Sequence, residues 1–161
     1  MRTFQYSVSY SGNSQFVMNN ILQTLLPLGF RIIEQSEGTL IVEGPGYNST
    51  RQNALSGMSR GIFSFSRSTI SIDADLGGVD RMSRFLLFLL AGMGIFNTLV
   101  FTGLWLFIDK LHAHPWFLAI PGMTLLLWIF IAPIMTKWIR KRCEEAITNF
   151  LDNTALFHNP L

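Results

Sequence analysis

Charged side chains are scarce in this sequence, and the shortage is concentrated in two places. Lysine, arginine, aspartate and glutamate make up 14% of the 161 residues, whereas about 25% is usual for globular proteins. Residues 85–108 and 116–136 contain none of these four residue types. Because buried core helices of small soluble domains seldom run so long without a charge, we expect both segments to span a membrane.

The groups that support catalysis, metal binding and ion transport are also missing or poorly spaced. Cys143 is the only cysteine, which excludes an intrachain disulfide. The two uncharged segments also lack histidine, so they show no sign of a proton or ion pathway. Asp109, His112 and His114 are expected to form a polar turn rather than a metal site, because a fourth ligand is not defined. We therefore predict a protein that is not an enzyme and that binds no cofactor, metal or nucleic acid.

Each uncharged segment is long enough to cross a bilayer as a helix. At about 1.5 Å per residue, residues 85–108 extend about 36 Å and residues 116–136 about 31 Å, against a hydrocarbon core of about 30 Å. The short loop 109–115 predicts a hairpin, so residues 81–136 form one transmembrane unit. The flanking basic residues are Arg81, Arg84, Lys137, Arg140, Lys141 and Arg142. The positive-inside rule then predicts a multi-pass protein of the cytoplasmic (inner) cell membrane with both termini in the cytoplasm.

Residues 1–80 are predicted to form a cytoplasmic α+β domain with the element order β-α-β-β-β-β. Apolar and polar residues alternate over 3–10, which indicates a strand, and apolar residues recur at helical spacing over 17–28. Four further strands are expected to form two hairpins that turn near residues 36–38 and 67–68. An antiparallel sheet with the helix on one face is the natural arrangement.

Residues 137–161 are predicted to form an amphipathic cytoplasmic helix and tail. The apolar stripe of this helix comprises Ile139, Cys143, Ile147, Phe150 and Leu151. Ion pairs between residues four apart are expected on its wet side, Arg140–Glu144 and Lys141–Glu145. The stripe can cover the N-terminal domain, lie in the membrane interface or meet another protein. We favour the first of these three.

Asn97 is a polar residue that falls near the middle of the first predicted span. An amide in hydrocarbon needs a hydrogen-bond partner, and we expect a bond across the hairpin to Thr124 or to the carbonyl of Ile129. The alternative is that Asn97 faces a partner helix or a bound cofactor. A stripe of small residues that favours close approach of the second span comprises Gly94, Thr98 and Thr102.

These features favour a non-catalytic membrane protein that serves as an accessory or scaffolding subunit of a larger complex. Respiratory, photosynthetic and transport assemblies are all candidates. The expected partners are the lipid bilayer and other membrane-protein subunits.

The alternative function is a membrane-anchored sensing or binding module for anionic lipid headgroups or a small anion, through the loop 44–61. The residues that would bind the anion are Arg51, Arg60, Arg81 and Arg84. A cation held by Asp73, Asp75 and Glu43 is a weaker hypothesis than a solvated sheet face.

Overall fold

The computed structural model describes residues 3–11, 13–47, 53–108 and 114–156. The chain divides into two units. The first comprises Met1–Met82 and Trp138–Leu161, and the second comprises Ser83–Lys137. The helical segment after residue 137, which the sequence suggested as a separate region, therefore belongs to the same unit as the N-terminal domain.

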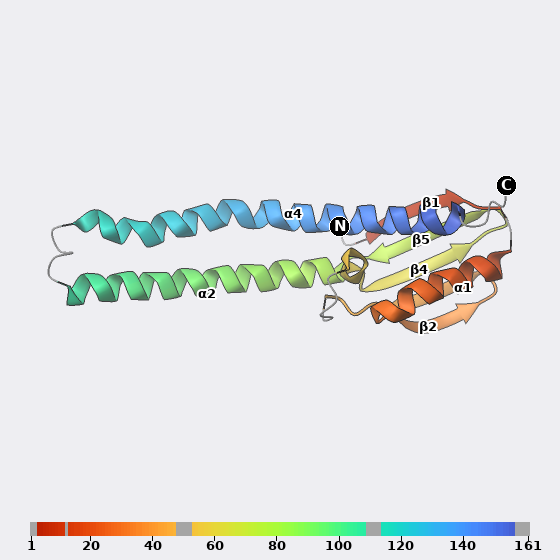
Figure 1. The fold of residues 1–161 in the computed structure, drawn as a ribbon, viewed down its shortest axis with the longest axis horizontal. Helices are drawn as coiled ribbons and strands as arrows, with labels where there is room; N and C mark the ends of the chain where they lie inside the picture. The colour runs from red at the N-terminus through yellow and green to blue at the C-terminus, as the bar shows by residue number, and fades with distance from the viewer. Residues whose placement is uncertain (1–2, 12, 48–52, 109–113, 157–161) are drawn as a thin grey trace. The chain divides into compact units, whose positions relative to one another are not determined.

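The first unit is an α+β domain built on a five-stranded antiparallel sheet, as predicted (Figure 1). Its strands are β1 (Thr3–Ser9), β2 (Arg31–Ser36), β3 (Thr39–Glu43), β4 (Arg60–Phe65) and β5 (Thr69–Asp75). The spatial order is β1-β5-β4-β3-β2. The last four strands form a meander, while β1 pairs with β5 from the far end of the domain's sequence.

Helix α1 (Ser14–Leu25) connects the two edge strands of the sheet. It begins at Asn13, whose side chain accepts a hydrogen bond of 2.9 Å from the Gln15 amide. A short 3-10 turn, η1 (Leu26–Leu28), contains Pro27 and leads to Gly29 at φ +91°. A proline followed by a left-handed glycine is a typical way to end a helix.

One face of the sheet carries the core. Burial alternates along β5, where Ile70, Ile72 and Ala74 are buried and the residues between them are half-buried. Helix α1 and the C-terminal part of α4 (Ala119–Leu156) pack on this face. The Tyr6 hydroxyl on β1 donates a hydrogen bond of 2.9 Å to Asp152 on α4.

The predicted apolar stripe of the C-terminal segment is part of this core. Cys143, Ile147 and Leu151 of α4 are fully buried within the domain, and the Phe150 ring packs edge-on against that of Phe63 on β4. Burying a large aliphatic side chain contributes about 1.5–3 kcal/mol. The prediction that the stripe covers the N-terminal domain is therefore confirmed.

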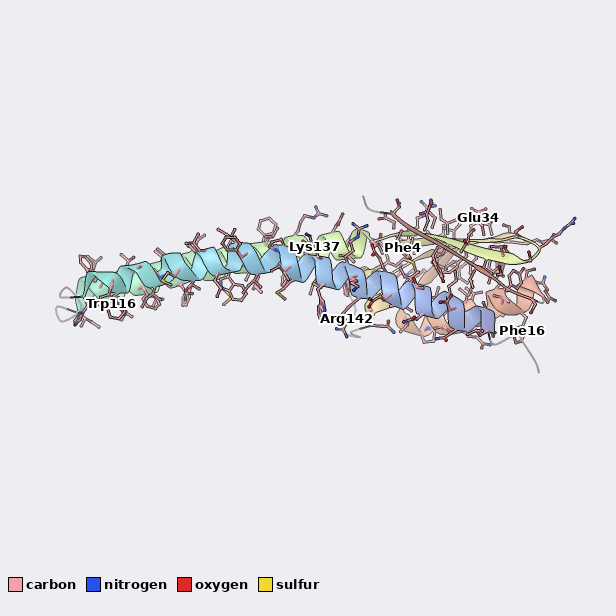
Figure 2. All side chains as sticks on the ribbon, turned by 90° about the horizontal axis from the view of Figure 1, so that it is seen from above. Phe4, Phe16, Glu34, Trp116, Lys137 and Arg142 are labelled. Atoms are coloured by element: carbon pink, nitrogen blue, oxygen red, sulfur yellow. The ribbon has the colours of Figure 1, made fainter. Side chains whose placement is uncertain are left out.

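No described element covers the opposite face of the sheet, and Glu34 projects from this face (Figure 2). Edge strand β2 is exposed along its whole length. A register shift between Ile32 and Glu34 places a bulge at Ile33. Ile32 and Ile33 are 42% and 53% exposed, so this edge presents adjacent apolar side chains to its surroundings.

The second unit is a pair of antiparallel helices, the later part of α2 (Gly77–Phe107) and the early part of α4 (Figure 1). A 3-10 turn, η3 (Pro115–Leu118), precedes α4. Both helices are long and apolar enough to cross a membrane. Their most apolar stretches are only 6% and 11% buried within the protein, whereas the core helix of a soluble domain would be mostly buried. α4 continues without a break from the predicted second span into the domain, with Pro133 inside it.

Candidate functional site at the hairpin end of the domain

Helix α2 leaves the sheet at Gly77, directly after β5, and we call this end of the first unit the hairpin end. The Asp75 carboxylate accepts a hydrogen bond of 3.0 Å from the Gly77 amide and so caps the helix. A Cβ on Gly78 would lie 2.7 Å from the Gly57 carbonyl oxygen and 3.1 Å from the Gly46 Cα. Because this leaves no room for a side chain, the first turn of α2 rests directly on the segments that carry Gly46 and Gly57.

Helix α4 reaches the same place through Cys143. The Cys143 Sγ lies 2.8 Å from the position of a Cβ on Gly57, and the Tyr47 ring is 3.0 Å from it. Burial, with a smaller contribution from Glu144, raises the pKa of the Cys143 thiol to about 12. A thiol that remains protonated near neutral pH is a poor nucleophile, so the role of Cys143 here is packing.

A sharp turn at Gly46 and Tyr47 closes this cluster. Both residues have left-handed backbone, with φ of 58° and 60°, a conformation that costs a residue with a side chain about 1–2 kcal/mol. The Tyr47 amide donates a hydrogen bond of 3.0 Å to the Ser56 carbonyl, which ties the turn to the 3-10 segment η2 (Ala54–Gly57). Burial and Cys143 raise the pKa of Tyr47, and Arg142 opposes them. Arg142 directly precedes Cys143, so α4 brings it to the same end of the domain.

Arg81 of α2 and Arg142 of α4 both belong to this end of the domain. A terminal nitrogen of Arg81 on α2 is 3.5 Å from the position of a Cβ on Gly46. Arg142, labelled in Figure 2, stacks its guanidinium over the Trp138 ring at 4.5 Å from the ring centroid. Both arginine side chains are exposed. Each of the two helices thus brings one exposed arginine to the hairpin end.

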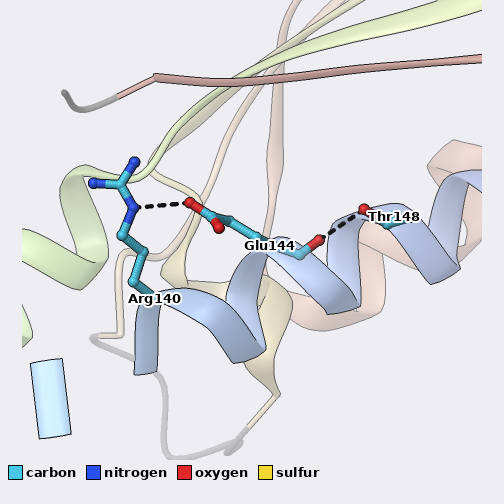
Figure 3. A network of polar contacts seen from close by, with 3 residues as sticks. All are labelled: Arg140, Glu144 and Thr148. Carbon is cyan, nitrogen blue, oxygen red and sulfur yellow. Dashed lines mark hydrogen bonds and ion pairs between the residues drawn. The ribbon is translucent and has the colours of Figure 1, made fainter. Parts of the chain in front are cut away.

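The neighbouring basic residues of α4 are neutralised by carboxylates. Arg140 Nε donates a hydrogen bond of 2.8 Å to Glu144 Oε1, and the Thr148 hydroxyl bonds the Glu144 carbonyl (Figure 3). Lys141 Nζ lies 3.7 Å from Glu145 Oε1. Both predicted ion pairs are confirmed. Within the described part of the chain, Arg81 and Arg142 form no such pair.

Of the four arginines that the sequence suggested for an anion site, the structure describes three. Arg81 is at the hairpin end, Arg84 belongs to the second unit, and Arg51 lies outside the described residues. Arg60 is the first residue of β4, and its cross-strand neighbours are Glu43 on β3 and Asp75 on β5. Arg142 was missed, although the sequence holds a signal for it. Arg140 and Lys141 each have a glutamate four residues on, whereas the residue four positions after Arg142 is Ala146.

The charged residues at the start of β4 form an alternating row across the sheet. Arg60 stands between Glu43 on β3 and Asp75 on β5, so these two carboxylates are separated by a cation. Asp73 accepts a hydrogen bond of 3.0 Å from Gln5. Among the described residues, no cluster of histidine, cysteine, aspartate and glutamate is arranged to hold a metal ion.

In the second unit, Gly94 lies where the two helices pack tightly. A Cβ on Gly94 would overlap the Leu125 side chain. The Ser83 and Thr136 hydroxyls are hydrogen-bonded at 2.9 Å, and the Phe101 and Phe117 rings are 4.9 Å apart at their centroids. These pairs fix the antiparallel register of the hairpin.

This register places Asn97 level with Gly122. Asn97 is half-buried, and the described residues provide no hydrogen bond to its side chain. Thr124 instead donates to the Ile120 carbonyl of its own helix. The expected bond from Asn97 across the hairpin does not form in the structure.

The predicted stripe of small residues divides between two environments. Gly94 is buried against the second helix, whereas Thr98 and Thr102 are exposed. The Thr98 hydroxyl bonds the Gly94 carbonyl within its own helix at 2.9 Å. Of these three residues, Gly94 is therefore the one that packs against the second helix.

Comparison of the chain with protein-family models, with curated proteins and with solved structures finds no match.

Proposed function

We propose that the chain is an integral protein of the cytoplasmic (inner) membrane, with both termini in the cytoplasm and residues 83–137 crossing the bilayer as a hairpin. The supporting observation is the discontinuous core of the first unit. Residues before and after the hairpin share that core, so they lie in one compartment. The segment between them must cross the bilayer an even number of times, and its two apolar helices allow two crossings.

Site-specific labelling of intact cells tests this topology. Single cysteines replace exposed residues Arg67 and Asn153 in the domain and His114 beside the loop. Cys143 can stay, because it is buried and its thiol is protonated. An impermeant maleimide should label position 114 only, and label at 67 or 153 from the same side would refute the hairpin.

We further propose that the protein is a non-catalytic accessory or scaffolding subunit of a larger membrane complex, of respiratory, photosynthetic or transport type. The exposed edge strand β2 supports this proposal, because it presents the adjacent apolar side chains of Ile32 and Ile33, which are 42% and 53% exposed, between the charged residues Arg31 and Glu34. An edge of this kind can pair with an added strand, with side-chain pockets giving specificity.

A photo-crosslinking amino acid at Ile33 tests the proposed interface, and the same substitution at Ser9 on the opposite edge is the control. The full chain is extracted in mild detergent, and its mass is measured under native conditions. We expect one discrete adduct from position 33, of the partner found in the native complex. A chain that extracts as a monomer and gives no adduct would refute the accessory role.

A further inference from the structure

The hairpin end carries two positive charges that the described part of the chain does not neutralise. Among the nearby carboxylates, Asp75 caps Gly77, Glu144 bonds Arg140, and Glu145 faces Lys141. Asp80, beside Arg81 on α2, also has a partner. Arg81 and Arg142 remain, and both are exposed. Arg81 lies beside the turn at Gly46, and Arg142 adjoins Cys143, which packs against Gly57 in the same cluster. Their charges can therefore act on a ligand from outside.

Stacking restrains the Arg142 guanidinium, and the packing of α2 positions the backbone of Arg81. Arg142 is stacked on the Trp138 ring, an interaction that holds the planar group while its N–H donors remain available at the edge. Arg81 extends from the first turns of α2, which Gly78 seats against the backbone of Gly46 and Gly57. Less conformational freedom is lost when restrained side chains bind, so the entropic cost of binding is lower.

Guanidinium groups match oxyanions that can accept several parallel hydrogen bonds, and phosphate is the commonest such group. The position in the chain indicates the source of the phosphate. Arg81 directly precedes the apolar part of α2, and Trp138 follows Lys137 at the end of the apolar part of α4. Tryptophan is enriched where helices meet lipid headgroups, and juxtamembrane basic residues attract anionic lipids.

We propose that Arg81 and Arg142, with Trp138 stacked beneath Arg142, bind the phosphate of an anionic phospholipid headgroup next to the turn at Gly46 and Tyr47. This site differs from the four-arginine set suggested by the sequence, because it uses one residue from each end of the hairpin. It does not depend on a protein partner. It requires that the hairpin be closed and the domain folded.

The test uses the full chain in neutral detergent micelles and counts bound lipids by native mass spectrometry, with phosphatidylglycerol and phosphatidylcholine as probes. Arg81→Gln and Arg142→Gln should each weaken phosphatidylglycerol binding about fivefold and together about 25-fold, from roughly 1 kcal/mol per basic residue. Arg67→Gln, which removes the same charge at the opposite end of the sheet, is the matched control and should have no effect. Phosphatidylcholine should bind equally to all variants.

Two further measurements test whether the loss of binding comes from misfolding and whether the site prefers free phosphate to a lipid. Arg81→Lys with Arg142→Lys keeps both charges and should keep the preference for phosphatidylglycerol even if a glutamine variant is poorly folded. Inorganic phosphate is titrated as a separate probe. Equal loss in Arg67→Gln would show a general charge effect and overturn the site, as would unchanged binding in the double glutamine variant. Inorganic phosphate that displaces phosphatidylglycerol at equal concentration would overturn the assignment to a lipid, and so would a lysine variant that binds no better than the glutamine variant.

Discussion

Leu151→Ala is expected to destabilise the sheet domain strongly, whereas Leu156→Ala on the same helix is not. Leu151 is fully buried and Leu156 is 68% exposed, so the two substitutions remove the same atoms from opposite environments. Deleting a buried leucine side chain costs about 2.7–5 kcal/mol, and exposed sites usually change stability by less than about 0.5 kcal/mol. Since a small domain has about 5–15 kcal/mol in total, Leu151→Ala removes a large share.

Amide hydrogen exchange of the full chain in detergent measures this difference locally. A loss of about 3 kcal/mol should speed exchange of the protected amides about a hundredfold, at roughly 1.4 kcal/mol per factor of ten. The effect should be read on β5 and β4, because these strands carry the core face beneath α4. The Leu156→Ala variant should exchange like the unmodified chain.

Equal exchange in the two variants would refute the discontinuous core. The stripe of α4 would then cover a partner or the membrane surface instead of the sheet. The proposed hairpin topology would lose its main support at the same time, because it depends on residues from both ends of the chain sharing one core.

Three further predictions concern other parts of the chain. Gly94→Ala should weaken the helix hairpin by about 1–3 kcal/mol through overpacking. Gly92→Ala should have no such effect, because its new Cβ would meet no atom within 4 Å. Crosslinking between the helices measures the difference, and equal effects of the two substitutions would contradict the close approach. Cys143 should react with iodoacetamide at neutral pH about a thousandfold more slowly than a thiol of ordinary pKa, given a rise from 9.0 to about 12, and fast alkylation without unfolding would contradict its burial. The hydrogen bond to Asp152 raises the pKa of Tyr6 above its ordinary value of 10.0. The stability that this bond contributes is therefore present below about pH 10 and is lost as the pH rises through the pKa of Tyr6 in the folded protein. Tyr6→Phe should make the unfolding free energy fall less steeply at alkaline pH, and an unchanged fall would contradict the bond.

The local elements could be predicted from the sequence because their signals are local. Alternation of burial along β1 and β5, helical spacing in α1 and the two uncharged segments each reflect one element meeting one environment. The apolar stripe of α4 could be predicted for the same reason, because Cys143, Ile147 and Leu151 recur every four positions and face one surface.

The hairpin end could not be predicted, because its contacts join segments distant in sequence. A side chain at position 57 would collide with Cys143 and Tyr47, and a side chain at position 78 would collide with the backbone of Gly57 and Gly46. From the sequence alone these glycines indicate only flexibility or turns. The pairing of β1 with β5 and the register of the hairpin depend likewise on distant residues.

The discontinuous core has a consequence for assembly if the hairpin spans the membrane as we propose. Residues 1–82 emerge first during synthesis, but the stripe on α4 that covers β5 and β4 follows only after both apolar helices. Until then the core face of the sheet is partly exposed, and a small domain missing three fully buried side chains is expected to be unstable. Folding of the domain therefore has to follow insertion and closure of the hairpin. The arginine pair at the hairpin end is also assembled only at that step, since Arg81 and Arg142 come from opposite ends of it. Lipid binding there would stabilise the closed state by mass action, because the open chain lacks the paired site.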